Sequence, residues 1–122
     1  MKIVIKIGSS TLTGKAGSAL NIEAVNKLVE VVAHLKSRGD EVVIGSSGAI
    51  AAGLAPLGLS TRPKDLVTQQ AAASVGQGLL IAKFNEALSQ YKLVAAQVLL
   101  TIEDIIRRSH YKSAQGTLNK LL

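Results

Sequence analysis

The chain has 122 residues, of which 48% are hydrophobic and none is cysteine, and its formal net charge is +6. This composition allows one hydrophobic core and excludes both a disulfide framework and a thiolate zinc site. No apolar run approaches the ~20 residues of a membrane span, and the first residues lack the pattern of a signal peptide. We therefore expect one unit over residues 1–122, in the cytoplasm and with no membrane partner.

The positive charge does not by itself indicate a nucleic-acid partner. The 14 Lys and Arg residues are spread along the chain, and Arg107-Arg108 is the closest pair. Only Phe84, Tyr91 and Tyr111 offer rings for base stacking. A positive balance also suits a site that receives a polyanionic nucleotide. Salt-sensitive binding of DNA or RNA would support the alternative, but we expect no nucleic-acid partner.

Three apolar runs predict β-strands, at residues 2–7, 41–45 and 92–101. They are continuous rather than alternating, which is typical of parallel strands covered on both faces. Between the first two, apolar residues at helical spacing predict a helix at residues 21–38. Asn21 is a suitable N-cap for this helix.

Further helices are expected after the second strand. They are a short helix at 48–54, a long helix at 65–90 and a final helix at 103–122. The final helix is expected to be interrupted around Ser109 and Gly116. The alternation of strands and helices predicts an α/β fold with a right-handed, mainly parallel sheet.

Small residues dominate the middle of the long helix, in the stretch that begins at Ala71 and ends at Gly78. Such residues let another helix approach closely. Two interpretations stay open at this stage: a seam between two copies in a homo-oligomer, or tight packing on the sheet.

The first candidate site follows the first strand, because parallel sheets bind ligands at the carboxyl ends of their strands. Lys6 stands near the strand end, followed by Gly8, Ser9 and Ser10. Glycine permits close approach of the backbone, hydroxyl and N–H groups donate to phosphate oxygens, and an ammonium group neutralises developing charge. The alternative is a plain turn with a surface lysine.

Two nucleotide-binding motifs are excluded. Gly8 and Gly14-Lys15 resemble a P-loop, but five residues separate the glycines and Ala16 follows the lysine. The dinucleotide-binding Gly-x-Gly-x-x-Gly pattern follows none of the predicted strands.

The second candidate site follows the second strand, at Ser47, Gly48 and Ala49. Small residues open space there, and N–H groups at the start of the next helix bind a carboxylate. The alternative is an ordinary turn in which a serine caps the helix. Because both sites are expected at one edge of the sheet, we expect one cleft with a phosphate side and a carboxylate side.

These motifs, with segments 69–77 and 97–101, resemble the glutamate 5-kinases of the amino acid kinase family. The resemblance implies a three-layer α/β/α fold and transfer of the ATP γ-phosphate, with Mg²⁺, to the side-chain carboxylate of L-glutamate, the first step of proline biosynthesis. It implies that Lys6 contacts the transferring phosphates, that Gly8 and Ser9 line the phosphate loop with Ser10 beside them, and that Ser47, Gly48 and Ala49 hold glutamate.

The resemblance also implies that the domain is truncated, since family chains continue through a second half that supplies most of the adenine site. Residues 112–116 depart from an asparagine-rich family segment, and Gly45 stands where the family prefers an apolar residue. Asp104 either faces the glutamate pocket or is a surface carboxylate at a helix start. His34 and His110 are given no role, and no protein-bound metal site is expected.

Three alternatives remain. One is another family member, such as an acetylglutamate or carbamate kinase. Another is a non-catalytic fragment that binds ligand or assembles with copies of itself. The third is the nucleic-acid binding considered above.

Overall fold

The computed structural model describes residues 1–13 and 19–122, and two strands in these ranges form a parallel sheet. β1 (Lys2–Ile7) and β2 (Glu41–Ser46) pair along their whole lengths, with Lys6 opposite Gly45 and Ile7 opposite Ser46. The connection between them contains α2 (Ile22–Ser37), as predicted. Both strands therefore end at the same edge of the sheet.

α2 begins and ends where the sequence predicts. The Asn21 side chain accepts a hydrogen bond from the Ala24 N–H at 3.3 Å, which satisfies one free donor of the first turn. Gly39 follows with a φ of +85°, a conformation that glycine adopts without strain. Between these ends, the buried residues recur on one face and include Val25 and Val29. That face packs toward the sheet.

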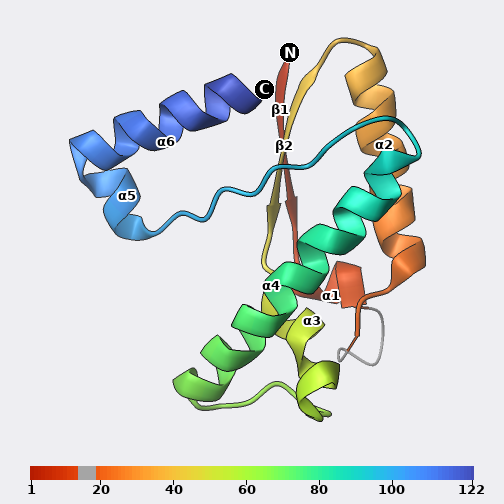
Figure 1. Ribbon diagram of the computed structural model, residues 1–122, viewed down its shortest axis with the longest axis vertical. Coiled ribbons are helices and arrows are strands. Elements are labelled where there is room, and N and C mark those ends of the chain that lie inside the picture. Colours follow the sequence, from red (N-terminus) through yellow and green to blue (C-terminus); the bar gives the residue numbers. More distant parts are fainter. Residues whose placement is uncertain (14–18) are drawn as a thin grey trace.

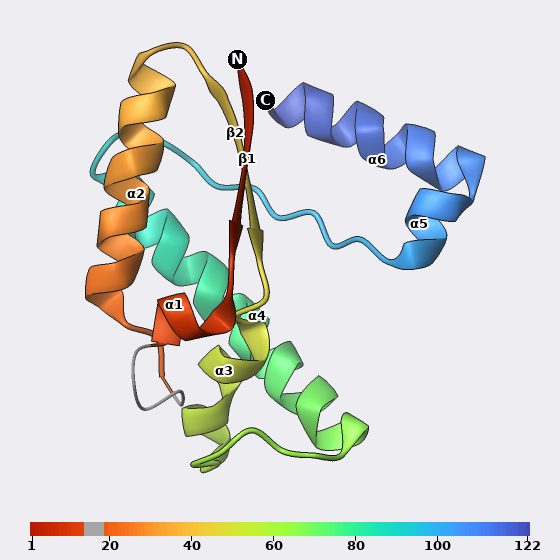
Figure 2. The same ribbon diagram turned by 180° about the vertical axis from the view of Figure 1, so that it is seen from behind.

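The core lies between the sheet, α2 and α4 (Leu66–Ser89). Its buried members are Ile7, Leu12, Val25, Val29, Val32, Leu80, Phe84, Ala87 and Leu88. Figures 1 and 2 show α2 and α4 on one side of the strands, and α5 (Ile102–Ile106) and α6 (Arg108–Leu121) on the other. The predicted α/β fold with a parallel sheet is confirmed; the sheet is small, and the core packs against one of its faces.

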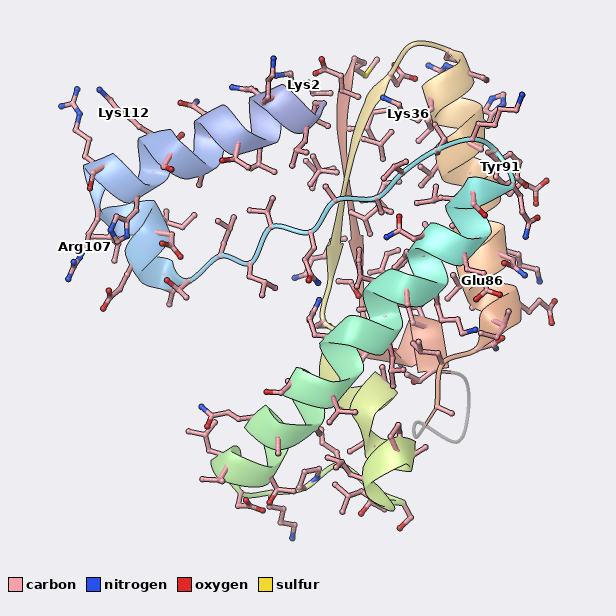
Figure 3. All side chains as sticks on the ribbon, viewed as in Figure 1. Lys2, Lys36, Glu86, Tyr91, Arg107 and Lys112 are labelled. Carbon is pink, nitrogen blue, oxygen red and sulfur yellow. The ribbon has the colours of Figure 1, made fainter. Side chains whose placement is uncertain are left out.

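The expectation that the strands are covered on both faces is wrong. In β1, Ile5 and Ile7 face the core, so the alternate residues Lys2, Val4 and Lys6 face away, and Val4 is 73% exposed. Lys2 and Lys6 lie on this outer face together with Val4, and their charged groups favour contact with water over burial. This explains why the outer face of β1 is exposed. Near the start of this face, Lys2 Nζ donates to Asn119 Oδ1 at 3.0 Å, beside the end of α6 (Figure 3).

The third predicted strand, at residues 92–101, is also wrong. Residues 93–101 run as an irregular segment after α4. Leu93 packs against the core, and the Ala95 N–H donates to the Asn85 side chain at 2.8 Å, whereas Val94 is 89% exposed. Apolar β-branched residues form a strand only where another strand accepts their backbone hydrogen bonds. In the described ranges, no such partner pairs with this segment.

The final helical segment breaks at Arg107, two residues before Ser109, where an interruption was predicted, but it does not break around Gly116. The Arg107 N–H donates to the Glu103 carbonyl at 2.9 Å and ends α5, and its extended backbone (φ −78°, ψ 116°) redirects the chain into α6. Figure 3 shows Arg107 at this bend. Gly116 lies inside α6. No helix in the described part of the chain is long and apolar enough to cross a membrane.

The small residues of α4 serve a contact with α3 (Ala49–Leu54), which η1 (Ala55–Leu57) follows. Ala72 and Gly76 are buried, and a Cβ atom on Gly76 would overlap the carbonyl oxygen of Ala49 and the amide nitrogen of Gly53. Tight packing within one chain is therefore observed, against α3 rather than the sheet. Association of two copies through the exposed side of this stretch stays a prediction.

We expect Gly76→Ala to lower the free energy of unfolding by about 3 kcal/mol or more, because the backbone it would strike has no flexible end that can move aside. Gly78→Ala is the matched control on the same helix. Nothing lies within 4 Å of its added Cβ, so it should stabilise α4 by about 0.5–1 kcal/mol. Urea unfolding followed by circular dichroism measures both. Equal stability of the two variants would contradict the close contact.

Asp40 joins the starts of the two strands. Its carboxylate is buried and accepts a hydrogen bond from the Met1 amino group at 3.0 Å, while Arg38 Nε lies 3.3 Å from its second oxygen. The hydrogen bond from Met1 lowers the pKa of Asp40 below its ordinary value of 3.8; burial opposes this shift and the charge of Arg38 adds to it.

A lowered carboxyl pKa stabilises the fold above the unfolded-state pKa and loses this effect as the pH falls through the folded-state pKa. We therefore expect Asp40→Asn to reduce stability at pH 7. The difference from the parent should shrink as the pH falls below about 4, where the parent carboxyl also becomes neutral. Urea midpoints between pH 2.5 and 7 test this, with the exposed Glu30→Gln as control. A pH-independent difference would refute the role of the charge.

Candidate active site

The parallel register places the two predicted segments side by side. Lys6 pairs with Gly45, and neighbouring strands lie about 4.8 Å apart. The chain leaves β1 through Gly8 and β2 through Ser47, so both segments begin at the same edge of the sheet. The sequence-predicted placement at one edge is observed.

The segment after β1 is more ordered than the predicted loop. It forms a short helix, α1 (Ser9–Thr13), in which the Thr13 hydroxyl donates to the Ser9 carbonyl at 3.0 Å. Leu12, only 1% exposed, anchors this turn in the core, and this apolar contact explains why the segment folds. Ser10 stays exposed and Ser9 is half-buried. Gly14 and Lys15, which excluded a P-loop, lie outside the described residues.

The Lys6 side chain lies on the exposed face of β1. Among residues 1–13 and 19–122, no acidic group lies within ion-pair distance of its ammonium group. A cation without a protein partner keeps its charge available to an anionic ligand. Lys6 therefore lies on the open face of β1, and its contact with phosphate stays a prediction.

The segment after β2 forms a tight turn into α3. Ser47 is exposed, Gly48 is buried and Ala49 begins the helix. The N-cap is Gly48 and has no side-chain hydrogen bond, so the serine cap of the alternative interpretation is not observed. Instead the Ser46 hydroxyl oxygen accepts a hydrogen bond from the Gly48 N–H at 3.2 Å. This N–H is already paired, which leaves the Ser47 hydroxyl and the first-turn N–H groups for a ligand.

One contact joins the two segments. A Cβ atom on Gly48 would lie 3.3 Å from Leu12 Cδ1 of α1, 3.4 Å from the Ser46 hydroxyl and 3.8 Å from Leu80 Cδ1 of α4. Gly48 has ordinary right-handed angles, so its requirement is for space rather than for an unusual backbone. The spacing between the segments is thus fixed by packing on Leu12. Sequence inspection did not identify this role of Leu12.

Asp104 is a helix-start carboxylate. Its Oδ2 atom accepts hydrogen bonds from the N–H and the hydroxyl of Thr101, both at 2.7 Å, and His110 Nδ1 lies 3.2 Å from Oδ1. The Thr101 N–H is the largest cause of the lowered pKa of Asp104. Figures 1 and 2 show α5 apart from α1 and α3. The surface interpretation of Asp104 is therefore confirmed, and His110 gains a partner that sequence inspection did not assign.

The other residues noted in the sequence have, where the structure describes them, no contact that indicates a function. His34 is exposed on α2, as expected, and residues 112–116 lie within α6. Over the described ranges, no three His, Asp or Glu side chains lie close enough to hold a metal ion.

Comparison with known proteins identifies the family. The model of the amino acid kinase family matches residues 1–122, the whole chain. The chain belongs to the amino acid kinase family. It is similar to proteins named glutamate 5-kinase from Salinispora arenicola (56% identical) and Streptomyces coelicolor (54% identical), each over 99% of this chain and 32% of the relative. It is also 51% identical to the glutamate 5-kinase of Thermobifida fusca, over 99% of this chain and 31% of the relative. The chain thus spans about a third of the length of these relatives.

In this member of the amino acid kinase family, the contact between Gly48 and Leu12 can be tested with a double-mutant cycle. Gly48→Ala should cost about 1–2 kcal/mol of stability, because the new methyl group crowds Leu12. Leu12→Ala alone should cost about 2–5 kcal/mol through the cavity it leaves. In the double variant the cavity receives the methyl group, so the combined cost should be smaller than the sum.

Urea unfolding of the four proteins gives the coupling energy. Gly116→Ala combined with Leu12→Ala is the control, because nothing lies within 4 Å of a Cβ on Gly116. Additive costs for Gly48 and Leu12 would show that the segments are not joined by this contact.

Proposed function

We propose that this chain supplies the phosphate and substrate wall of an ATP-dependent glutamate 5-kinase. The observation that carries the proposal is the pairing of Lys6 with Gly45, which puts the Lys6 cation and the two segments that follow the strands at one edge of the sheet. The similarity to proteins named glutamate 5-kinase supports the substrate assignment. In this proposal Lys6, Gly8, Ser9 and Ser10 bind the phosphates, and Ser47, Gly48 and Ala49 bind glutamate.

The proposed reaction requires no general base. A glutamate side chain has a pKa of about 4.3 and is an anionic nucleophile at neutral pH. One carboxylate oxygen attacks the γ-phosphorus of ATP, a new oxygen–phosphorus bond forms, and the bond to the bridging oxygen of ADP breaks. The products are glutamyl 5-phosphate and ADP. The protein must hold two anions together and neutralise the charge that develops, which is the task proposed for Lys6.

Mg²⁺ is a prediction from the family resemblance. The described residues provide no cluster of three acidic or histidine ligands, so no step is assigned to a metal ion held by this chain alone. Mg²⁺ commonly binds through nucleotide phosphates, water and one or two carboxylates.

The proposal is testable in a chimaera in which residues 1–122 replace the matching third of the Salinispora arenicola relative. We expect Lys6→Ala to reduce kcat for glutamate phosphorylation at least about a hundredfold, because an aligned cation near developing charge is lost. Hydroxylamine traps the acyl phosphate as a hydroxamate, and ADP release gives the rate. Lys2→Ala, on the same strand face but at the other end of β1, should leave the rate unchanged.

The unmodified chimaera separates the candidate substrates. Phosphorylation of N-acetylglutamate or carbamate in place of glutamate would refute the glutamate assignment and favour an acetylglutamate or carbamate kinase. Normal turnover by the Lys6→Ala chimaera would refute the role of Lys6. If the chimaera folds but turns over none of the three substrates, the non-catalytic alternative is favoured.

A further inference from the structure

Ser46 is the last residue of β2 and lies one position before the proposed glutamate contacts. Its hydroxyl oxygen accepts the Gly48 N–H at 3.2 Å, a turn stabilised by a side chain that bonds the backbone two residues ahead. Ser46 belongs to the segment singled out in the sequence, but no role was predicted for it. The signal in the sequence is a serine two residues before a glycine at the end of a strand.

The turn needs this hydrogen bond because Gly48 has no side chain with which to hold itself in place. A Cβ atom on Gly48 would lie 3.3 Å from Leu12 Cδ1 and 3.8 Å from Leu80 Cδ1, so there is little room for a side chain, and the neighbouring Ser46 oxygen is the group that pairs its N–H. The Gly48 carbonyl in turn accepts the Ala52 N–H at 3.0 Å and starts α3. The conformation of Ser47, between Ser46 and Gly48, is therefore restrained on both sides.

Register strengthens this restraint from the other strand. Ser46 pairs with Ile7, whose side chain is only 8% exposed, so the backbone before the turn is fixed to the core. Beyond this pair the strands end, and the Ser46 hydroxyl oxygen is the acceptor for the Gly48 N–H. Loss of the hydroxyl would leave a partly buried N–H unpaired and allow the Ser47 segment to shift.

We infer that Ser46 is a positioning residue that shapes the turn at Ser47, Gly48 and Ala49 for a carboxylate substrate. This inference rests on the proposed function. The Ser46 hydroxyl acts through the Gly48 backbone and does not itself contact the substrate. Its effect should therefore fall on the glutamate side of the site and spare the phosphate side at Lys6 and Gly8.

The test uses three substitutions in the chimaera of residues 1–122 with the Salinispora arenicola relative. Ser46→Thr keeps the accepting oxygen, Ser46→Val has the shape of threonine without it, and Ser46→Ala removes it without adding bulk. We expect Ser46→Val and Ser46→Ala to raise the KM for glutamate about tenfold, the scale of one lost hydrogen bond. The KM for ATP should stay within about twofold, and Ser46→Thr should restore the parent KM for glutamate.

Outcomes for the inference and for the proposed function are distinct. An unmodified chimaera without glutamate kinase activity counts against the proposed function. An active chimaera in which Ser46→Ala leaves the KM for glutamate unchanged overturns the role of Ser46. Equal rises in both KM values, or no rescue by Ser46→Thr, would assign Ser46 a general structural role and also overturn the inference. If Ser46→Val unfolds, as urea midpoints would show, the comparison of Ser46→Ala with Ser46→Thr decides.

Discussion

Backbone hydrogen bonds between β1 and β2 hold Lys6 beside Gly45 and Ile7 beside Ser46, and the rest of the candidate site is built outward from these pairs. A shift of one residue would turn Lys6 toward the core and Ile7 toward solvent, because side chains alternate along a strand. Burial of Ile7 therefore fixes the register and, through it, the position of the lysine. A packing requirement on one face thus determines a functional position on the other.

Elements with local signals could be predicted from the sequence. Asn21 caps α2 and Asp65 caps α4, where its side chain accepts the Thr68 N–H at 2.8 Å. Such caps depend on residues three positions apart, so they are visible without knowledge of the tertiary structure. The first two strands were also evident, and their parallel pairing followed from the helix between them. The placement of the Lys6 and Ser47 segments at one edge was therefore accessible to sequence reasoning.

Features that depend on contacts between residues far apart in the sequence could not be predicted from it. Residues 93–101 have the composition of a strand, but a strand also requires a neighbour, and the observed contacts of this segment include a hydrogen bond to the Asn85 side chain. The small residues around Gly76 predicted that another element packs closely on α4. They did not indicate that this element is α3. The short helix α1 depends on burial of Leu12 beneath Gly48, a contact between residues 36 positions apart.

The contact between α3 and α4 also has a mechanical consequence. At Gly53 and Gly76 the two helices meet backbone to backbone, with no side chain between them that could change rotamer. The spacing between α3 and α4 is therefore set by backbone atoms and not by the rotamers of side chains. The Ser47 turn leads directly into α3, so its position is tied to α4 as well as to β2.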